Sequence, residues 1–393
     1  FRRVLFRSNV FIHTPSDGQH TSALTIPRDQ APGLDWYHPH VHGNTNESVF
    51  KGLAGPFLVR GGLEALPELR RVRSRTIVIK GHQFVPRVTP PTMVPIADAA
   101  PAKTVFTLNG AMQPRLVMAP GETQLWRLAN MTSGVFVDLH LTGHSFWVLA
   151  EDGSEGFVPY RVDHVFMSPG KRFEVLVTAD SRQGDFVLST TGFDNGGIVS
   201  PAQDLATVRV KGTPTTSVRP PKRISSPPAW LDHKPVRRRE FTLSRAESPT
   251  GPTFLINGKT FDHEDLHHPF EVQVDTVEEW VVRNDPRVPG QPDSMESHPF
   301  HVHVNDIYVV GRGTWDPATG ESTSYIPETP HGPKDTENVA PNEYVVLKTK
   351  FERFTGKTVF HCHILFHEDR GMMGAFRIVD RTPADSDHHH VGM

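Results

Sequence analysis

One cysteine and 23 histidines are the residues of this 393-residue chain whose types and spacing point to chemistry. The informative ones gather in three segments, Trp36-Tyr-His-Pro-His-Val-His-Gly43, Ser297-His-Pro-Phe-His-Val-His303 and His361-Cys-His-Ile-Leu-Phe-His-Glu-Asp-Arg-Gly-Met372. A lone cysteine excludes an internal disulfide. Imidazole and thiolate are ligands that suit copper, so the three segments together predict metal sites.

The segment around Cys362 predicts two sites back to back. Successive side chains of a β-strand point to opposite faces. In an extended segment His361 and His363 therefore share one face, and Cys362 takes the other. The thiolate can then bind one metal ion while its two neighbours bind others across the strand, about 10 Å away at a rise of about 3.3 Å per residue.

On the cysteine side, the same alternation adds a histidine from the second segment. His298 lies three residues before His301 and so faces the opposite way. Two imidazoles, one thiolate and a weak axial thioether make a blue-copper electron-transfer site. The predicted ligands of this site are His298, Cys362, His367 and Met372.

On the other side, all the predicted ligands are imidazoles. Histidines spaced by two residues share a face of a strand, and the first and second segments each contain such a pair. Copper suits this set as well. The predicted ligands are His38, His40, His301, His303, His361 and His363.

Short strand-like runs must position these ligands. The chain has 31 Gly and 35 Pro residues, which favours a turn-rich β architecture over a helical bundle. Such runs at regular spacing are typical of β-sandwiches, so we expect an all-β fold. The runs are 76–80, 124–128, 173–177, 270–274, 279–283, 344–348 and 358–360.

A weak internal repeat indicates two copies of one β-module. Residues 120–130 resemble residues 274–284. Aligning Gly153 with Gly313 places Asp138 opposite His298, so the middle copy has the same scaffold without the imidazoles. Only the later copy contains the candidate metal ligands.

The chain divides at two predicted joints. The Pro- and Ser-rich stretch 212–235 reads as a linker, and a second joint is expected between residues 61 and 75. A complete sandwich needs about 100 residues, so the first is expected to be incomplete. The predicted units are a first sandwich at 1–68, a second at 69–215, a third at 236–382 and a disordered polar tail at 383–393.

Composition argues against two kinds of partner, nucleic acid and the membrane interior. The formal net charge is −3, so no broad basic surface for nucleic acid is indicated. The apolar stretches are all shorter than the eighteen or more residues that a membrane span requires. We therefore expect neither a nucleic-acid partner nor a membrane span.

The three motifs resemble those of the multicopper oxidases, the family of laccases, copper-efflux oxidases, ferroxidases and bilirubin oxidases. The resemblance extends from Val10 to about Asp380, and its His-Cys-His motif is highly specific. It implies tandem cupredoxin-like Greek-key β-sandwiches, with a type 1 copper in the third domain and a three-copper cluster between the first and third. By motif position, it implies type 1 ligands His298, Cys362, His367 and Met372, a type 2 ligand His301, and type 3 ligands His38, His40, His303, His361 and His363.

The resemblance also implies an activity. Single electrons from a small reducing substrate would cross through Cys362 to His361 and His363, and four of them would reduce O2 to two waters at the cluster; these three residues are thus the predicted catalytic ones. We expect a laccase-like phenol oxidase holding four copper ions when complete. A periplasmic or secreted location is implied as well.

Four alternatives stay open to different degrees. Within the family, the alternative is a copper or manganese metallo-oxidase. The alternative of another class is a blue-copper electron-transfer or copper-binding protein without oxidase activity. A copper nitrite reductase is disfavoured, because its cysteine strand lacks the His-Cys-His arrangement. A cysteine protease would leave the remaining clustered histidines unexplained.

Two departures from the family pattern matter. The family has a further His-x-His motif upstream, and His13 and His20 are a poor substitute for it. We therefore expect an N-terminally truncated chain, and the sequence leaves open whether the chain is active as it stands. At Phe366, some bacterial laccases have a Glu thought to assist proton delivery, so that role would fall to another carboxylate.

Other candidate residues have ordinary explanations. His42 faces away from His38 and His40 by alternation, and Glu368 and Asp369 suit a loop surface at least as well as a copper-tuning role. We expect the remaining histidines to be core or surface residues rather than ligands. They are His82, His140, His144, His164, His233, His263, His267, His268 and His331.

Overall fold

The computed structural model describes residues 10, 18, 21, 25–28, 30–85, 92–93, 103–196, 198–352 and 354–380. His13, His20 and the predicted tail at 383–393 lie outside these residues. Strands account for 50% of the chain and helices for 7%, which confirms the all-β prediction. In the described part, none of the helices combines the length and the apolar character needed to span a bilayer.

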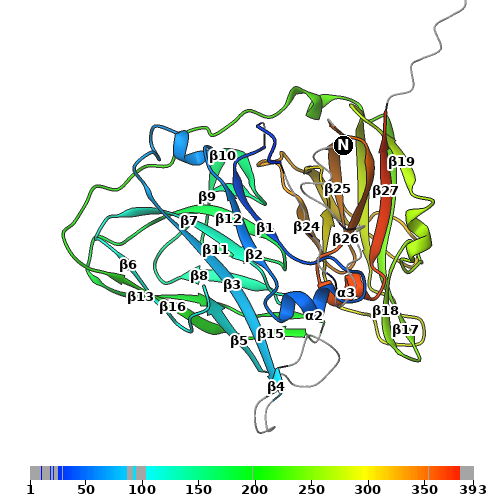
Figure 1. Ribbon diagram of the computed structural model, residues 1–393, viewed down its shortest axis with the longest axis horizontal. Coiled ribbons are helices and arrows are strands. Elements are labelled where there is room, and N and C mark those ends of the chain that lie inside the picture. The colour runs from blue at the N-terminus through cyan, green and yellow to red at the C-terminus, as the bar shows by residue number, and fades with distance from the viewer. Residues whose placement is uncertain are drawn as a thin grey trace, which may run out of the picture.

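The first unit is small in the described residues. Strands β1 (Gly33–Tyr37) and β2 (Gly55–Val59) form an antiparallel pair. The segment between them contains helix α2 (Thr45–Phe50), and the short 3₁₀ turn η1 (Leu63–Ala65) follows. In Figure 1 this blue hairpin lies between two larger β bodies.

The central unit is a sandwich of two sheets. Its larger sheet has the order β10-β9-β12-β7-β3-β4, with β5 also paired to β3, and its smaller sheet has the order β11-β8-β13-β16-β6. The larger sheet contains β3 (Arg73–Val85), β4 (Thr92–Met93), β5 (Lys103–Leu108), β7 (Thr123–Asn130), β9 (Phe146–Glu151), β10 (Ser154–Val162) and β12 (Arg172–Thr178). The smaller contains β6 (Arg115–Met118), β8 (Val137–Leu141), β11 (His164–Met167), β13 (Gly184–Thr190) and β16 (Gln203–Val210).

Alternation along the strands builds the core of this sandwich. In β8, Val137, Leu139 and Leu141 are buried while the residues between them are partly exposed. These side chains pack with Trp126 and other apolar residues from the facing sheet. Burial of apolar surface between the two sheets stabilises the unit at roughly 25 cal/mol per Å² removed from water.

The C-terminal unit repeats this architecture. Its sheets have the orders β18-β17-β20-β25-β22-β23 and β19-β27-β26-β21-β24. The first contains β17 (Arg237–Ser248), β18 (Gly251–Ile256), β20 (Val277–Asp285), β22 (Ile307–Thr314), β23 (Ile326–Pro327) and β25 (Glu343–Lys350). The second contains β19 (Phe270–Gln273), β21 (His298–Val302), β24 (Thr336–Val339), β26 (Gly356–Cys362) and β27 (Met373–Val379).

Shorter elements complete the chain. The hairpin β14 (Phe193–Asn195) and β15 (Ile198–Ser200) follows β13, and the linker to the C-terminal unit contains the turn η2 (Ala229–Asp232). The turn η3 (His263–Leu266) and helix α3 (Leu365–Asp369) lie in the C-terminal unit. The predicted boundaries, 68/69 and 215/236, fall between strands of neighbouring units, and the division itself stays a prediction.

The three units meet around α3. Figure 1 shows α2 of the first unit beside α3 of the C-terminal unit. The Asp369 carboxylate accepts hydrogen bonds from the backbone N–H groups of Thr45 (3.0 Å) and Asn46 (2.8 Å). A residue of the C-terminal unit therefore caps the first turn of α2, whose own N-cap residue Asn44 makes no side-chain cap bond.

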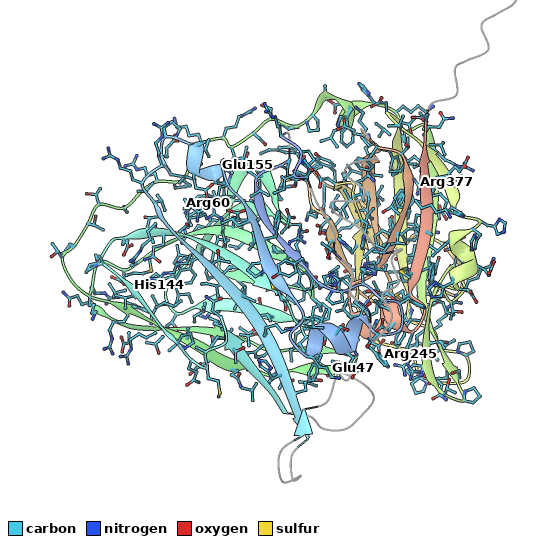
Figure 2. All side chains as sticks on the ribbon, in the orientation of Figure 1. Glu47, Arg60, His144, Glu155, Arg245 and Arg377 are labelled. Carbon is cyan, nitrogen blue, oxygen red and sulfur yellow. The ribbon has the colours of Figure 1, made fainter. Side chains whose placement is uncertain are left out.

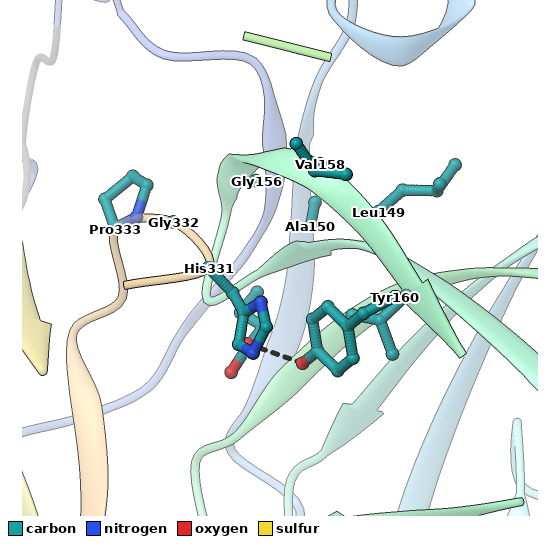
Figure 3. Close-up of a pocket in the computed structure, with 10 residues that line it drawn as sticks. Leu149, Ala150, Gly156, Val158, Tyr160, His331, Gly332 and Pro333 are labelled. Atoms are coloured by element: carbon teal, nitrogen blue, oxygen red, sulfur yellow. Dashed lines mark hydrogen bonds between the residues drawn. The ribbon is translucent and has the colours of Figure 1, made fainter. Parts of the chain in front are cut away.

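The central and C-terminal units also meet at a small cavity of about 10 Å³, room for about one water. Tyr160 stacks on His331 there, with ring centroids 4.2 Å apart. Its hydroxyl donates a 2.8 Å hydrogen bond to Glu151, the dashed line in Figure 3. Glu151 in turn pairs with Lys171 and Lys334, so the contact between the units is charged and largely buried.

Candidate metal centres

The end of β26 has the alternation expected from the sequence. Phe300 of β21 lies opposite Cys362, and His301 lies opposite His361. Cys362 is fully buried in the apolar core together with Phe300. His361 instead contacts His40 of the first unit, with the two Nε2 atoms 3.1 Å apart.

On the core side, a thiol and two imidazoles converge. The Nδ1 atoms of His298 and His367 are 3.1 Å apart, and each lies 3.7 Å from the Cys362 sulfur. All three side chains are at most 2% exposed. The backbone of buried Met372 is hydrogen-bonded to two of these residues. Its carbonyl accepts from the Cys362 N–H group, and its own N–H group donates to the His367 carbonyl. Helix α3 brings His367 back to the strand that carries Cys362.

On the opposite side, imidazoles from three segments converge. His40 and His303 both direct Nε2 at Nε2 of His361, at 3.1 and 2.9 Å. The other three predicted imidazoles lie beside this group. The centroid of the His363 ring is 5.3 Å from that of His301 and 5.7 Å from that of His38. All six predicted imidazoles of this side are therefore brought together.

Hydrogen bonds fix the orientation of several rings. In each case Nδ1 lies within hydrogen-bond distance of a backbone carbonyl: His38 of Pro39 (2.8 Å), His301 of Asp335 (2.9 Å) and His361 of Cys362 (2.9 Å). With the proton on Nδ1, the Nε2 lone pair is available to a metal.

Burial keeps these groups in the form that binds metal. Burial lowers the pKa of His38 to about 4 and that of His298 to about 3, and it lowers the pKa values of His40, His303, His361, His363 and His367 as well. These imidazoles are therefore neutral near pH 7, as ligands must be. Burial raises the pKa of the Cys362 thiol well above its usual range, so a thiolate at this place requires a cation.

The donor sets fit copper. Among the described residues, two groups of three donors are close enough to hold one ion each: His298, Cys362 and His367 on the core side, and His40, His303 and His361 on the opposite side. A triangle with edges of 3.1–3.7 Å leaves its centre about 2 Å from each donor, a normal metal–ligand distance. His363 Nδ1 is buried without a hydrogen-bond partner, as expected of a ligand. One thiolate with two imidazoles, beside an all-imidazole set, is the ligand chemistry of copper.

Other histidines lie elsewhere. His42 packs against Phe261 and His263, away from the six imidazoles. His263, His267 and His268 are exposed, as expected. The sequence did not pair His140 with His164, yet the two lie opposite each other on β8 and β11 with rings 4.8 Å apart.

Two carboxylates lie at the centres. The sequence left Glu368 open between a copper-tuning role and a loop surface; it is fully buried, because α3 packs against the first unit, so it is not a surface residue. Its oxygens lie 3.4 Å from His40 Nδ1 and 3.3 Å from His361 Nδ1. Glu296 lies 3.6 Å from His367 Nε2. The signal for Glu368 was its place inside the third motif; Glu296, two residues before His298, carried no comparable signal.

Comparisons with known proteins agree with this arrangement. Two family profiles, both described as multicopper oxidase, match residues 33–213 and 232–382. A laccase of Bacillus subtilis is 26% identical over 383 residues, covering 90% of this chain and 72% of the relative. A multicopper oxidase of Staphylococcus aureus is 25% identical and covers 87% and 67%.

The fold has solved counterparts. A multicopper oxidase from Campylobacter jejuni, described as a metallo-oxidase, superposes with a TM-score of 0.73 at 23% identity, covering 92% of this chain and 74% of that one. The likeness shows the fold, which confirms the predicted cupredoxin-like sandwiches. Because the two profiles together match most of the residues, the chain belongs to the multicopper oxidase family.

Proposed function

We propose that this chain is a laccase-like oxidase, which couples one-electron oxidation of phenolic or similar donors to the four-electron reduction of O2 to two waters. The observation that carries the proposal is the back-to-back arrangement at the end of β26. Cys362 lies with His298 and His367 on one face, while His361 and His363 lie among imidazoles on the other. Family membership supports oxidase activity with O2 as the acceptor.

The proposed copper ligands are those that the motifs indicated. Copper bound there supplies the one-electron redox chemistry. The complete enzyme of this type holds four copper ions. The proposed sets are His298, Cys362, His367 and Met372 for type 1, His301 for type 2, and His38, His40, His303, His361 and His363 for type 3.

The chain itself connects the two donor sets. Cys362 is joined by one peptide bond to His361 and by another to His363. Its carbonyl also lies 2.9 Å from Nδ1 of His361, a second short connection. An electron entering at the thiol therefore has a direct covalent route to the imidazole side.

Glu368 supports the proton side of the reaction, because reduction of O2 to two waters consumes four protons. Burial raises the pKa of this carboxyl group, which favours a held proton. Thr45 Oγ1 donates to Glu368 Oε1 at 3.0 Å, and both carboxyl oxygens face imidazoles of the set. We assign Glu368 the role of holding a proton at the carboxyl next to His40 and His361.

The donor would approach from the side of Glu296. The Oε1 atom of Glu296 accepts a hydrogen bond from Arg245 (2.8 Å), and the Oε2 atom of Glu296 lies toward Nε2 of His367. Arg245, labelled in Figure 2 near α3, also lines a cavity of about 210 Å³. A phenol hydroxyl in this cavity would meet the charged pair one side chain away from His367.

The lining of that cavity favours a second candidate, a copper or manganese metallo-oxidase. Glu247 and Asp293 contribute carboxylates, and Met295, which is 60% exposed, contributes a thioether. Carboxylate and thioether groups are ligands for metal ions. A metal-ion donor would use these groups, whereas a phenol would not need them.

Oxygen uptake by the copper-loaded protein tests the proposal. With a phenolic donor such as 2,6-dimethoxyphenol, we expect four electrons taken from the donor for each O2 consumed, and no uptake by the Cys362→Ser variant. Faster uptake with Mn(II) or Cu(I) than with any phenol would favour the second candidate. A blue, copper-loaded protein that takes up no O2 with any donor would overturn both in favour of electron transfer without oxidase activity.

A periplasmic or secreted location belongs to the same proposal. It is supported by the family resemblance alone. Fractionation of the source cells, with detection of the protein by antibody, tests it: we expect the protein in the periplasmic or extracellular fraction, and recovery in the cytoplasm would contradict the proposal.

A further inference from the structure

The central unit, which supplies none of the proposed ligands, reaches the imidazole set through one turn. Residues Ser168–Arg172 connect β11 to β12, and Lys171 N donates to the Ser168 carbonyl to close the turn. Pro169 and Gly170 occupy its two central positions, and Gly170 has φ +82°. Pro followed by a glycine at positive φ is the pattern of a type II turn.

Gly170 lies directly against His363. A Cβ atom at position 170 would be 2.7 Å from three atoms of the His363 ring. The ring therefore rests on bare backbone, a close approach that only glycine permits. The central unit thus forms one wall of the space that holds His363.

Two residues further on, Arg172 links all three units and is only 3% exposed. Its guanidinium donates two hydrogen bonds to Asp335 of the C-terminal unit, at 2.9 and 2.7 Å. It also donates to Asp35 of the first unit (3.2 Å) and to the Leu34 carbonyl (3.2 Å). The planar fork of an arginine makes such simultaneous contacts, which a lysine cannot reproduce.

Asp335, which Arg172 holds, is one of the two residues that orient His301. The Asp335 carbonyl and Thr336 Oγ1 lie 2.9 and 3.1 Å from Nδ1 of His301. A second anchor comes from the central unit, since Asp152 accepts from the backbone N–H groups of Asp335 and Thr336 at 3.3 and 3.2 Å. The position of the His301 ring therefore depends on contacts made by the central unit.

We propose that the turn Ser168–Arg172 is a positioning element for the three-copper cluster, with Gly170 setting the place of His363 and Arg172 setting that of His301 through Asp335. The inference rests on the proposed copper cluster. The turn touches none of Cys362, His298 and His367 in any described contact. Its loss should therefore disturb the cluster and leave the blue copper unchanged.

Copper content and electron paramagnetic resonance of the copper-loaded protein test this proposal, using Gly170→Ala, Arg172→Met and Arg172→Lys. Changing groups that orient metal ligands lowers metal affinity by about 10- to 100-fold. We expect that loss for the cluster copper, with an altered type 2 signal and an unchanged blue absorption. Arg172→Lys keeps the charge and serves where Arg172→Met does not fold.

Matched controls separate positioning from general stability. Arg127, 2% exposed and paired with Glu174, is a buried arginine of the same unit, and Arg127→Met should keep the type 2 signal. Gly121 has φ +74° and a Cβ there would be 2.5 Å from the Thr215 carbonyl, so Gly121→Ala introduces similar strain.

Three outcomes overturn the inference. If the Gly170→Ala and Arg172→Lys variants both keep the type 2 signal and the copper affinity of the wild type, the turn has no positioning role. The proposed function would be unaffected by that result. Controls that lose cluster copper as readily as the test variants would reduce the effect to stability. A wild-type protein without any type 2 signal would instead contradict the proposed copper cluster, and the inference with it.

Discussion

The central and C-terminal units share one scaffold but differ in chemistry. In the central unit, the side-chain amide of Asn130 donates to the carbonyls of Val135 and Met167, both at 2.9 Å. In the C-terminal unit, Asn284 donates to the carbonyls of Glu296 and Val339, at 2.8 and 2.9 Å. Each amide ties the end of an equivalent strand to two loops or strands of the facing sheet.

A second pair of contacts is repeated in the same way. Trp126 Nε1 donates to Gln124 in β7, and Trp280 Nε1 donates to Glu278 in β20. Both tryptophans are fully buried. The repeat detected between residues 120–130 and 274–284 is therefore a repeat of hydrogen bonds as well as of amino-acid sequence.

The difference lies at one strand end. In the order of the sheets, β13 corresponds to β26, and β13 ends at Thr190 whereas β26 ends at Cys362. Thr190 Oγ1 accepts from the backbone of Asp138, while Cys362 faces two imidazoles. A shared scaffold thus tolerates either a hydrogen-bonded hydroxyl or a thiol that faces two imidazoles, and a few side chains make the difference.

The largest expected effect separates the two strand ends. Cys362→Ser should remove the blue absorption and reduce O2 uptake to background, because the soft sulfur ligand is lost. Thr190→Ser, the matching change in the central unit, should leave both unchanged since the hydroxyl is kept. Visible spectroscopy and oxygen uptake check this pair. Blue colour in Cys362→Ser would break the comparison.

The shared amides should contribute similar free energies. Asn130→Ala and Asn284→Ala each remove two buried hydrogen bonds from a side-chain amide to backbone carbonyls, which costs about 2 kcal/mol of unfolding free energy at about 1 kcal/mol for each bond. Urea unfolding of the copper-free variants measures both values. A cost at one position several times that at the other would show that the two scaffolds are not energetically equivalent.

The charged contact between the units should depend on pH. Burial alone raises the pKa of Glu151, but the charges of Lys171 and Lys334 outweigh it and hold that pKa well below its usual range. The folded protein then binds fewer protons than the unfolded chain, so this stabilisation is complete above about pH 4.5 and is lost as the pH falls.

Glu151→Gln isolates this contribution. We expect a loss of about 2 kcal/mol at pH 7, the value of hydrogen bonds to charged groups, and a smaller difference from wild type below pH 4.5. Thermal unfolding of copper-free protein between pH 3 and 7 provides the measurement. A difference that stays constant over this range would contradict the account of the contact.

The smallest expected effect concerns the first unit. Asp369→Ala removes the carboxylate that caps α2 from the C-terminal unit, which should cost about 1 kcal/mol of stability. The matched change Asp180→Ala removes a partly exposed aspartate of the central unit that bonds Arg182 locally, and should cost less. Equal losses in denaturant unfolding would argue against a cap that joins the units.

Local order made part of the centres predictable. The alternation of His361, Cys362 and His363 follows from an extended backbone, so neighbouring residues suffice to foresee it. The strand-like runs of the two sandwiches were predictable for the same reason, because they too depend on neighbouring residues. The division into units was expected from the Pro- and Ser-rich stretch 212–235 and a second joint between residues 61 and 75, and the ligand roles were expected from motif position. Both remain predictions.

Contacts between distant segments were not predictable from one sequence. Glu368 is buried because Thr45, 323 residues earlier, packs against it. Arg172 and Asp335 meet across two units, and the facing of His140 and His164 depends on the register of β8 and β11. No local pattern encodes such docking, since each partner carries an ordinary sequence around it.

The central claim is that two kinds of copper site lie back to back around Cys362. Diffraction from crystals of the copper-loaded protein, with anomalous differences recorded at the copper absorption edge, tests it directly. We predict one peak among His298, Cys362 and His367 and further density among His40, His303 and His361. Copper at neither place, or at only one of them in a fully loaded protein, would contradict the claim.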